Sequence, residues 1–437
     1  MPNVTLATCT VIVEGARTSD LQAAKNRGAR VLHEGFDGKV LLQCDSVEQA
    51  FGIANLLHER QVGSATPNFV RYIRPTAPSP QGTLGWAHRT LRVPEAWQIT
   101  QGSADVKIAV LDEGVDVGHP ALSAAVVAQK DFIGSNGNSA SPSGNDAHGT
   151  CCAGIIVSRD ANRPGIAKKC SLIAARIGMG DGHDGWVFDD YATADAIDWS
   201  WREGAAVISN SWGGGVASDA ISRAFGRART QGRGGLGSVV VIAAGNAQAP
   251  IDFPGNLPGY ITVGASNPSD ELKTRTSSDS ENWWGSNFGP TMWLLAPGVF
   301  ISTTDISGPA GYKPGDFTDE FNGTSSATPH VAAAAALILS IAPTLSASEV
   351  REILRATAVQ LPGQTTFTEE LGWGRLDVAA AVARAASATP LALGNAAPPA
   401  ATRATKKKKL KVKVKLEPKT KLKPKAKLKP KVKPARK

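Results

Sequence analysis

The amino-acid sequence predicts an α/β fold: a doubly wound, mostly parallel sheet, preceded by a small α+β domain and followed by a disordered basic tail. Three observations carry this prediction. Short β-branched runs alternate with helical stretches across residues 84–387, which is typical of a parallel sheet covered by helices on both faces. Residues 1–75 show the order βαββαβ instead. Residues 403–437 are rich in Lys and Pro.

The N-terminal segment 1–75 is predicted to form a small domain of its own. A β-branched run opens it, and a helix ended by Gly28 follows. A hairpin turning at Asp37-Gly38, a second helix and a closing strand complete the order. The Pro- and Ser-containing composition of residues 76–83 marks them as a linker.

Residues 84–387 contain the runs that we expect to form the parallel sheet: VKIAVLD, SLIAARI, AAVISNS, SVVVIAAGN and YITVGAS. The Ala-rich run that begins at His330 suits a buried helix stopped by Pro343, and SASEVREILRATA predicts a further helix behind an N-cap Ser. In such folds ligands and catalytic groups gather beyond the carboxyl ends of the strands. We therefore expect the catalytic side chains at the carboxyl ends of these strands.

The net charge of +9 hides a strong asymmetry along the chain. Residues 403–437 hold 18 basic residues and one acidic residue, and the remaining 29 basic and 37 acidic residues make the body acidic. After a Pro/Ala linker at 388–402, the tail is predicted to be extended and to bind polyanions in a salt-dependent way. It has no aromatic residue for base stacking, which argues against sequence-specific recognition. Nucleic acid and an anionic membrane surface both stay open as partners.

The sequence shows neither a signal peptide nor a run of 18 apolar residues. This slightly favours the cytoplasm, with a gene start upstream of the given one as the alternative. The five cysteines are odd in number and not tightly spaced, so we expect free, buried thiols rather than a disulfide framework or a zinc site.

Three segments carry residue types that fit nucleophilic catalysis. Asp112 ends the apolar run in KIAVLDEGVDVGHP, and His148 opens a small, apolar segment in NDAHGTCCAGI. Ser325 precedes the Ala-rich helix in FNGTSSATPHVA. A serine nucleophile needs an adjacent base, and the base needs a carboxylate that fixes its tautomer. Helix N-termini also offer backbone N–H groups to a developing oxyanion.

A fourth residue completes the set. Asn246, at the end of the run VVVIAAGN, can supply a second oxyanion donor. Taken singly, a strand-end Asp is more often a cap and a GTS sequence more often a turn. Taken together, the chain order Asp, His, Ser is that of subtilisin and differs from the orders in chymotrypsin and the α/β-hydrolases.

On these motifs the chain resembles the subtilases, the subtilisin-like serine peptidases, across residues 84–387. The matching stretches are AVLDEGVDVGHP, HGTCCAG, SWGG, AAGN and GTSSATPHVA. The resemblance implies a serine endopeptidase that works through an acyl-enzyme, with Asp112, His148 and Ser325 as the triad and Asn246 as oxyanion donor. It also implies that residues 1–75 are an inhibitory propeptide, removed by self-cleavage, whose last strand occupies the substrate site.

The same resemblance implies the residues that bind substrate. Ser211, Trp212 and Gly213 would pair with the substrate backbone, and Ala243, Ala244 and Gly245 would line one side of the specificity pocket. Asp252 would lie on the floor of that pocket and select a Lys or Arg side chain; alternatively it caps the turn that follows it. Glu113 stands where the family usually has Thr or Ser and where acidic residues occur in kexin-like convertases, and it would favour a second basic side chain.

The predicted partners are protein or peptide substrates, the chain's own propeptide, and a polyanion bound by the tail, and we expect a monomer. No cofactor and no metal ligand set is predicted. Calcium stays open, but Ala121 occupies a position that is commonly a calcium-ligating Asp in the family, which argues against the usual strong site. The rival function is a catalytically retired subtilase domain that serves as a polyanion-binding module.

Overall fold

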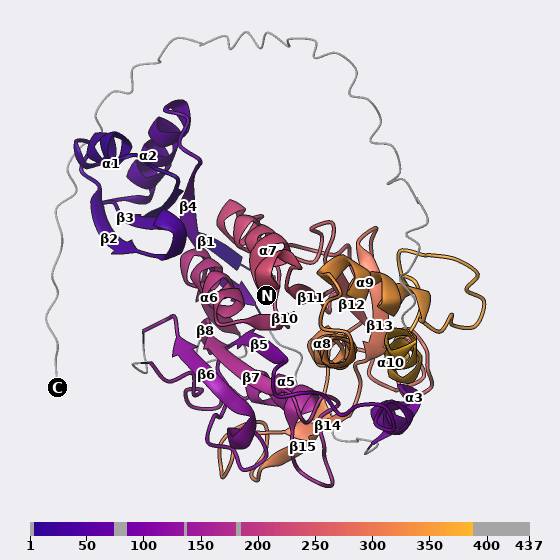
Figure 1. The fold of residues 1–437 in the computed structure, drawn as a ribbon. Helices are drawn as coiled ribbons and strands as arrows, with labels where there is room; N and C mark the ends of the chain where they lie inside the picture. Colours follow the sequence, from indigo (N-terminus) through magenta and orange to yellow (C-terminus); the bar gives the residue numbers. More distant parts are fainter. Residues whose placement is uncertain (1–3, 74–84, 135–137, 181–184, 388–437) are drawn as a thin grey trace, which may run out of the picture. The chain divides into compact units, whose positions relative to one another are not determined.

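The computed structural model describes residues 4–73, 85–134, 138–180 and 185–387, and it is drawn in Figure 1. The predicted linkers 76–83 and 388–402 and the predicted tail 403–437 lie outside the described residues. The chain up to Ala388 forms one compact unit.

The N-terminal segment has the predicted order of elements: β1 (Val4–Glu14), α1 (Thr18–Lys25), β2 (Arg30–Glu34), β3 (Val40–Gln43), α2 (Val47–Glu59) and β4 (Ser64–Ile73). Strand β1 pairs antiparallel with both β3 and β4. The hairpin turns where expected, since Asp37 and Gly38 have φ of 56° and 70°. Apolar residues of β1, β3 and α2, including Val11, Leu42 and Ile53, form its own core.

A seven-stranded sheet forms the centre of the rest of the chain. Its strands are β5 (Lys107–Asp112), β6 (Val126–Asp131), β7 (Ser171–Arg176), β10 (Ala205–Asn210), β11 (Val239–Ala243), β12 (Ile261–Ser266) and β13 (Met292–Pro297). The order is β13-β12-β11-β10-β5-β7-β6, and every neighbouring pair is parallel. This confirms the predicted fold class. The five predicted runs are the five central strands, and the two edge strands were not predicted.

Helices cover both faces of this sheet (Figure 1). On one face, α6 (Asp190–Arg202) and α7 (Asp219–Gln231) share an apolar cluster with strand residues such as Leu111 and Ile208. On the other, α5 (His148–Val157) and α8 (Thr324–Ile341) pack against the strands, with α9 (Ala347–Ala356) and α10 (Val378–Ala386) beside α8. By length and composition α8 could cross a membrane, but 89% of it is buried inside the molecule, as a core helix is.

The remaining α-helices and strands of the described chain are short: α3 (Trp86–Thr90), α4 (Val93–Ala96), β8 (Gly178–Gly180), β9 (Trp186–Asp189), β14 (Ile301–Thr304) and β15 (Phe317–Phe321). Strand β9 pairs antiparallel with β4, with Val70 opposite Asp189 and Ile73 opposite Trp186. The N-terminal strands therefore continue into β9 and β8 as one sheet, in the order β2-β3-β1-β4-β9-β8.

Candidate active site

Asp112 and His148 meet at the carboxyl end of the central strand β5. Asp112 is the last residue of β5, and His148 is the first residue of α5. The imidazole Nδ1 lies 2.9 Å from Asp112 Oδ1 and 3.2 Å from Oδ2. Gly149 allows this approach, because a Cβ there would lie 2.1 Å from the Gly114 carbonyl oxygen. The smallest residue is therefore required where the helix begins against the strand end.

The charge of Asp112 favours a protonated His148. Both side chains are only 1% exposed, and burial alone would lower the pKa of the imidazole. The negative charge of Asp112 and its hydrogen bond outweigh burial, so the pKa of His148 lies above its usual value. A base of this kind can accept a proton near neutral pH and is stabilised once it holds one.

Ser325 lies close to this pair, in the first turn of α8. Its Oγ donates to the Ser211 carbonyl oxygen at 3.1 Å, and its own carbonyl oxygen accepts from Ser211 Oγ at 3.0 Å. Cys152 Sγ contacts both the serine and the histidine, at 3.6 Å from the Ser325 carbonyl oxygen and 3.9 Å from His148 Nδ1. Among the residues that the structure describes, buried His148 Nε2 has no hydrogen-bond partner. Nε2 is the imidazole nitrogen that Asp112 does not contact.

Two aromatic side chains enclose the imidazole. Trp186 of β9 meets the His148 ring edge-on with centroids 4.6 Å apart, and Phe321 of β15 does so at 5.2 Å. Sequence reasoning missed both residues, because a lone aromatic in a loop or short strand carries no signal of its own. Trp186 belongs to the strand that pairs with β4, so the N-terminal segment and the imidazole share a neighbour.

Asn246 lies against the residue that precedes the serine. Its Oδ1 accepts from the Thr324 backbone N–H at 2.8 Å and from Thr324 Oγ1 at 2.9 Å. The Gly245 N–H donates to Thr324 Oγ1 at 3.0 Å. Gly245 has φ of +102°, and a Cβ there would lie 2.5 Å from Asn287 Nδ2, so glycine is needed at this bend. These bonds fix the orientation of the Asn246 amide beside the start of α8.

Glu113 lies behind the pair rather than on the surface. Its Oε1 accepts from the His148 backbone N–H at 2.8 Å, and the side chain is buried. Burial raises the pKa of Glu113 to about 8, and the charge of His148 opposes this only in part. The carboxyl group therefore supports the first turn of α5. Its predicted role in selecting a basic substrate side chain stays a prediction.

The predicted substrate-binding residues 211–213 follow β10, and residues 243–245 come at the end of the neighbouring strand β11. Trp212 is 2% exposed and packs on Phe188 and Phe225, so only its backbone can meet a substrate. The Gly214 N–H donates to the Phe253 carbonyl oxygen at 2.6 Å, which places Asp252 next to this segment. Ala243 and Ala244 are buried, Gly245 is partly exposed, and Asp252 is exposed.

One group of metal-capable side chains occurs within the described ranges. Oxygen, nitrogen and sulfur atoms of Asp112, His148 and Cys152 lie within 4.8 Å of one another. Burial raises the pKa of the Cys152 thiol well above its usual value, which favours the protonated thiol over the thiolate that binds metals. The group is therefore better interpreted as the acid–base pair with a buried thiol beneath it. All five cysteines are free.

Comparison with known proteins agrees with this geometry. The model of the subtilase family matches residues 103–374. Thermitase from Thermoactinomyces vulgaris is 35% identical over 63% of this chain and 89% of its own length. A calcium-dependent protease from Trichormus variabilis is 30% identical over 77% of this chain, which spans 56% of that protein. The crystal structure of fervidolysin from Fervidobacterium pennivorans covers 86% of this chain with a TM-score of 0.69 at 22% identity, and 61% of that chain is matched.

The family match includes the segments that hold Asp112, His148, Asn246 and Ser325. The solved structure, at its low identity, supports the fold. The named relatives are proteases, and over the aligned regions they are 30–35% identical to this chain. The chain belongs to the subtilase family and is a serine-type peptidase that acts on proteins or peptides.

Proposed function

We propose that the chain is a serine endopeptidase in which Ser325 is the nucleophile, His148 the general base and Asp112 the carboxylate that orients it. The observation that carries the proposal is the bond between His148 Nδ1 and Asp112 Oδ1, 2.9 Å long and buried, beside a serine at the start of a buried helix. The Nδ1–H bond leaves Nε2 as the basic nitrogen.

The reaction begins with a rotation of the Ser325 side chain. Its Oγ leaves the Ser211 carbonyl oxygen and donates to His148 Nε2, which then takes the proton as Oγ attacks the substrate carbonyl carbon. The tetrahedral intermediate collapses, the C–N bond breaks, and His148 gives its proton to the leaving amine. Water repeats the sequence on the acyl-enzyme and releases the second product.

Asn246 and the first N–H groups of α8 would stabilise the oxyanion. Because Oδ1 of Asn246 accepts from Thr324, the amide is oriented, and its NH₂ group is the part of the side chain that can donate to an oxyanion. In subtilisin, loss of this donor slows turnover about 100- to 1000-fold. That magnitude belongs to subtilisin, and we expect a similar loss in Asn246→Ala.

Residues 1–75 would act as an inhibitory propeptide, so that the enzyme is made as a zymogen. Pairing of β4 with β9 supports this, because β4 then occupies a strand edge beside Trp186 and the imidazole. Ion pairs reinforce the contact: Lys39 Nζ lies 2.9 Å from Asp198 Oδ2 with both side chains almost fully buried. The predicted linker follows Ile73, outside the described residues, and self-cleavage is expected there.

Selection of a basic substrate side chain is a proposal that fits Asp252 better than Glu113, because the two carboxyl groups differ in exposure. Asp252 is exposed, and within the described chain its carboxylate caps no backbone N–H, which supports availability to a Lys or Arg side chain. Glu113 is buried and bonded to the His148 N–H, which leaves it poorly suited to the same task.

Calcium binding is proposed at most as an accessory property. One relative is a calcium-dependent protease by name. In this chain Ala121 is buried, and Asp160 of the short loop after α5 accepts the N–H groups of Asn162 and Arg163 at 2.9 and 2.7 Å. With an alanine at position 121 and one oxygen of Asp160 bonded within its own loop, few carboxylate oxygens are left there for a strong calcium site.

Hydrolysis and processing by wild type and Ser325→Ala test the proposal together. The substitution removes one oxygen atom and no core volume, so the variant should fold while losing casein hydrolysis by at least about 1000-fold. Mass spectrometry should find wild type cut between Phe69 and Trp86 and the variant intact. Hydrolysis by the variant at a comparable rate would contradict the nucleophile. An inactive wild type with a DNA-binding tail would favour the rival function of a retired domain.

A further inference from the structure

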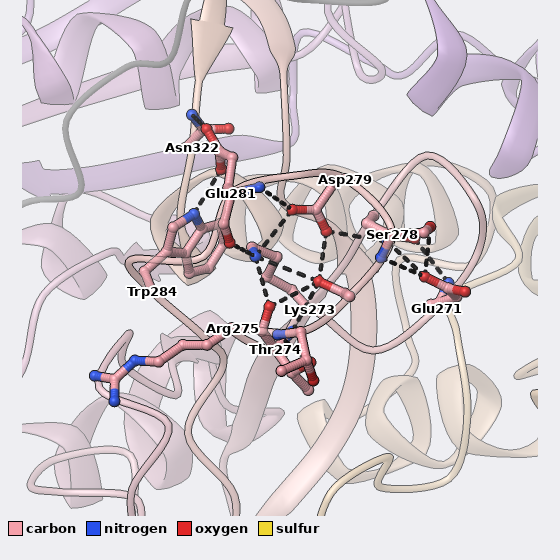
Figure 2. Close-up of polar contacts among 12 residues, drawn as sticks. Glu271, Lys273, Thr274, Arg275, Ser278, Asp279, Glu281, Trp284 and Asn322 are labelled. Atoms are coloured by element: carbon pink, nitrogen blue, oxygen red, sulfur yellow. Dashed lines mark hydrogen bonds and ion pairs between the residues drawn. The ribbon is translucent and has the colours of Figure 1, made fainter.

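A lysine without exposed surface organises the loop between β12 and β13. Lys273 Nζ donates to the carbonyl oxygens of Thr274 and Glu281, at 2.7 and 2.5 Å, and lies 3.0 Å from Asp279 Oδ1 (Figure 2). Asp279 Oδ1 also accepts the Glu281 N–H at 3.0 Å. A buried ammonium is tolerated only when its donors are met in this way. The loop is therefore held in one conformation that presents the Glu281 side chain inward.

Glu281 uses both carboxylate oxygens. Oε2 accepts the Trp284 indole N–H at 2.6 Å, and Oε1 accepts Nδ2 of Asn322 at 3.0 Å (Figure 2). The Glu281 side chain is almost fully buried, and Asn322 is fully buried. Asn322 Oδ1 in turn accepts the Phe300 backbone N–H at 2.7 Å. The loop thus reaches the chain three residues before Ser325.

Each of the three residues before Ser325 is held by a different segment. Asn322 is bonded to Glu281, the Gly323 N–H donates to the Gly298 carbonyl oxygen at 2.8 Å, and Thr324 is bonded to Asn246. The Asn322 contact is the one supplied by a carboxylate, and hydrogen bonds to an ionised group are about twice as strong as neutral ones. Glu281 is therefore one of the contacts that fix the chain just before α8.

We propose that Glu281 is a positioning residue for the peptidase reaction, which acts through Asn322 to set the place of Ser325 Oγ and of the first N–H groups of α8. The inference rests on the proposed function, in which Ser325 is the nucleophile. Catalysis by oriented groups is sensitive to small displacements, and one of about 1 Å can cost about 100-fold in rate. The two side-chain bonds of Glu281 described above go to Trp284 and Asn322 and not to the predicted substrate-binding residues 211–213 and 243–245, so its loss should act mainly on kcat.

The first test is Glu281→Gln, with Glu271→Gln as the matched control. A glutamine has one acceptor for two donors, so either Asn322 or Trp284 then faces an NH₂ group. We expect kcat to fall about 10- to 100-fold with KM within about twofold. Glu271 lies on the same loop, and its side chain accepts from Asn267 and Ser278 of that loop. Its variant should alter thermal stability at most and keep kcat per active site, counted by a fluorophosphonate probe.

The second test is rescue by a reciprocal exchange. In the double variant Glu281→Gln/Asn322→Asp, the glutamine NH₂ donates to the carboxylate introduced at position 322, the Phe300 N–H keeps an acceptor, and Trp284 keeps the glutamine oxygen. We expect kcat to return to within about threefold of wild type. Asn322→Asp alone places two carboxylates face to face and should be impaired.

Wild type and Ser325→Ala accompany every assay. If wild type is inactive, the proposed function fails, and the failure is visible before Glu281 is considered. If wild type is active and Glu281→Gln has the same kcat per titrated site, or loses only thermal stability, the positioning role is overturned. A double variant no better than Glu281→Gln, when both are folded, overturns it as well.

Discussion

At the scale of single residues, the candidate active site holds two consecutive buried carboxyl groups that contact one histidine in different ways. Asp112 accepts from the imidazole Nδ1, whereas Glu113 accepts from the backbone N–H of the same residue. Burial raises the pKa of Glu113 to about 8, so this group is mostly uncharged at neutral pH. The ring and the backbone of His148 are thus fixed separately, and only one of the two contacts requires a charge.

This difference predicts a pH-dependent stability. The folded-state pKa of Glu113, about 8, lies above its ordinary value of 4.5, so between these values the group ionises in the unfolded chain but stays protonated in the folded one, and the folded chain loses stability as pH rises. In Glu113→Gln the acceptor for the His148 N–H is kept and the titration is lost. On an inactive Ser325→Ala background, the variant should gain stability over its parent between pH 5 and pH 8, on the order of a few kcal/mol.

Thermal unfolding midpoints across pH 5 to 9 measure this gain. Glu203→Gln is the matched control, because Glu203 is exposed and should show no such trend. A gain in Glu113→Gln that is the same at every pH would show that the carboxyl group does not titrate in this range.

Sequence patterns singled out the residues that we propose to react, but not the residues that hold them. Asp112 and Ser325 stand at the end of an apolar run and at the start of a helix, where the strand and helix periods change. Lys273 and Glu281 were missed, since a polar stretch such as KTRTSSDSE is typical of an exposed loop. Only the folded chain shows that this lysine has no exposed surface. Burial of a charge is decided by tertiary contacts, which local patterns do not contain.

At the scale of elements, the centre of the sheet was predictable and its edges were not. The five central strands are apolar on both faces and give continuous runs. Edge strand β6 has the sequence VVAQKD, in which exposed and partly buried residues alternate up to the buried Asp131. In the other sheet, β9 has only four residues. Strand β9 is defined by pairing with β4, a strand more than a hundred residues away in the sequence. Such pairing follows from the tertiary fold, so no local pattern announces it.

The contact between the N-terminal elements and the helices α6 and α7 predicts how firmly the propeptide stays bound. Lys39 Nζ meets Asp195 Oδ1 at 3.2 Å and Asp198 Oδ2 at 2.9 Å, and all three side chains are nearly buried. Arg227 also bonds Asp198, at 2.7 Å. Removing one partner of a buried pair leaves the other charge uncompensated, which is strongly destabilising. In Lys39→Met the cleaved N-terminal fragment should dissociate at least about tenfold faster than in wild type.

The appearance of peptidase activity after self-cleavage reports this dissociation, and its lag should shorten in Lys39→Met. The exposed Lys25 provides the control variant Lys25→Met, whose lag should match that of wild type. An unchanged lag in Lys39→Met would mean that the buried ion pairs do not limit release of the fragment.

At the scale of the whole molecule, charge separates the tail from the body. Residues 403–437 carry 18 of the 47 basic residues with a single acidic residue, while the rest of the chain is net acidic. The described active-site groups all lie between Asp112 and Ser325, far from this tail in the sequence. Binding to polyanions and peptide hydrolysis are therefore expected to be separable.

Truncation after Ala388 tests this separation. The shortened chain should hydrolyse a small peptide at the wild-type rate, because no proposed catalytic residue is removed. It should lose retention on DNA at low salt, whereas the full chain should be released steeply as salt rises. Binding of DNA by the truncated, net-acidic body would contradict the charge argument, and a large loss of peptide turnover would contradict separability.

The central claim, that Ser325 is a nucleophile activated by His148, is tested most directly by the site of fluorophosphonate labelling. After removal of the N-terminal segment, by self-cleavage in wild type and by an added protease in the inactive variants, the probe should add its phosphonyl group to Ser325 alone, as peptide mass spectrometry can locate. Labelling should be slowed by at least about 1000-fold in His148→Ala and absent in Ser325→Ala. A folded wild-type protein that remains unlabelled, or one labelled at another serine, would contradict the account.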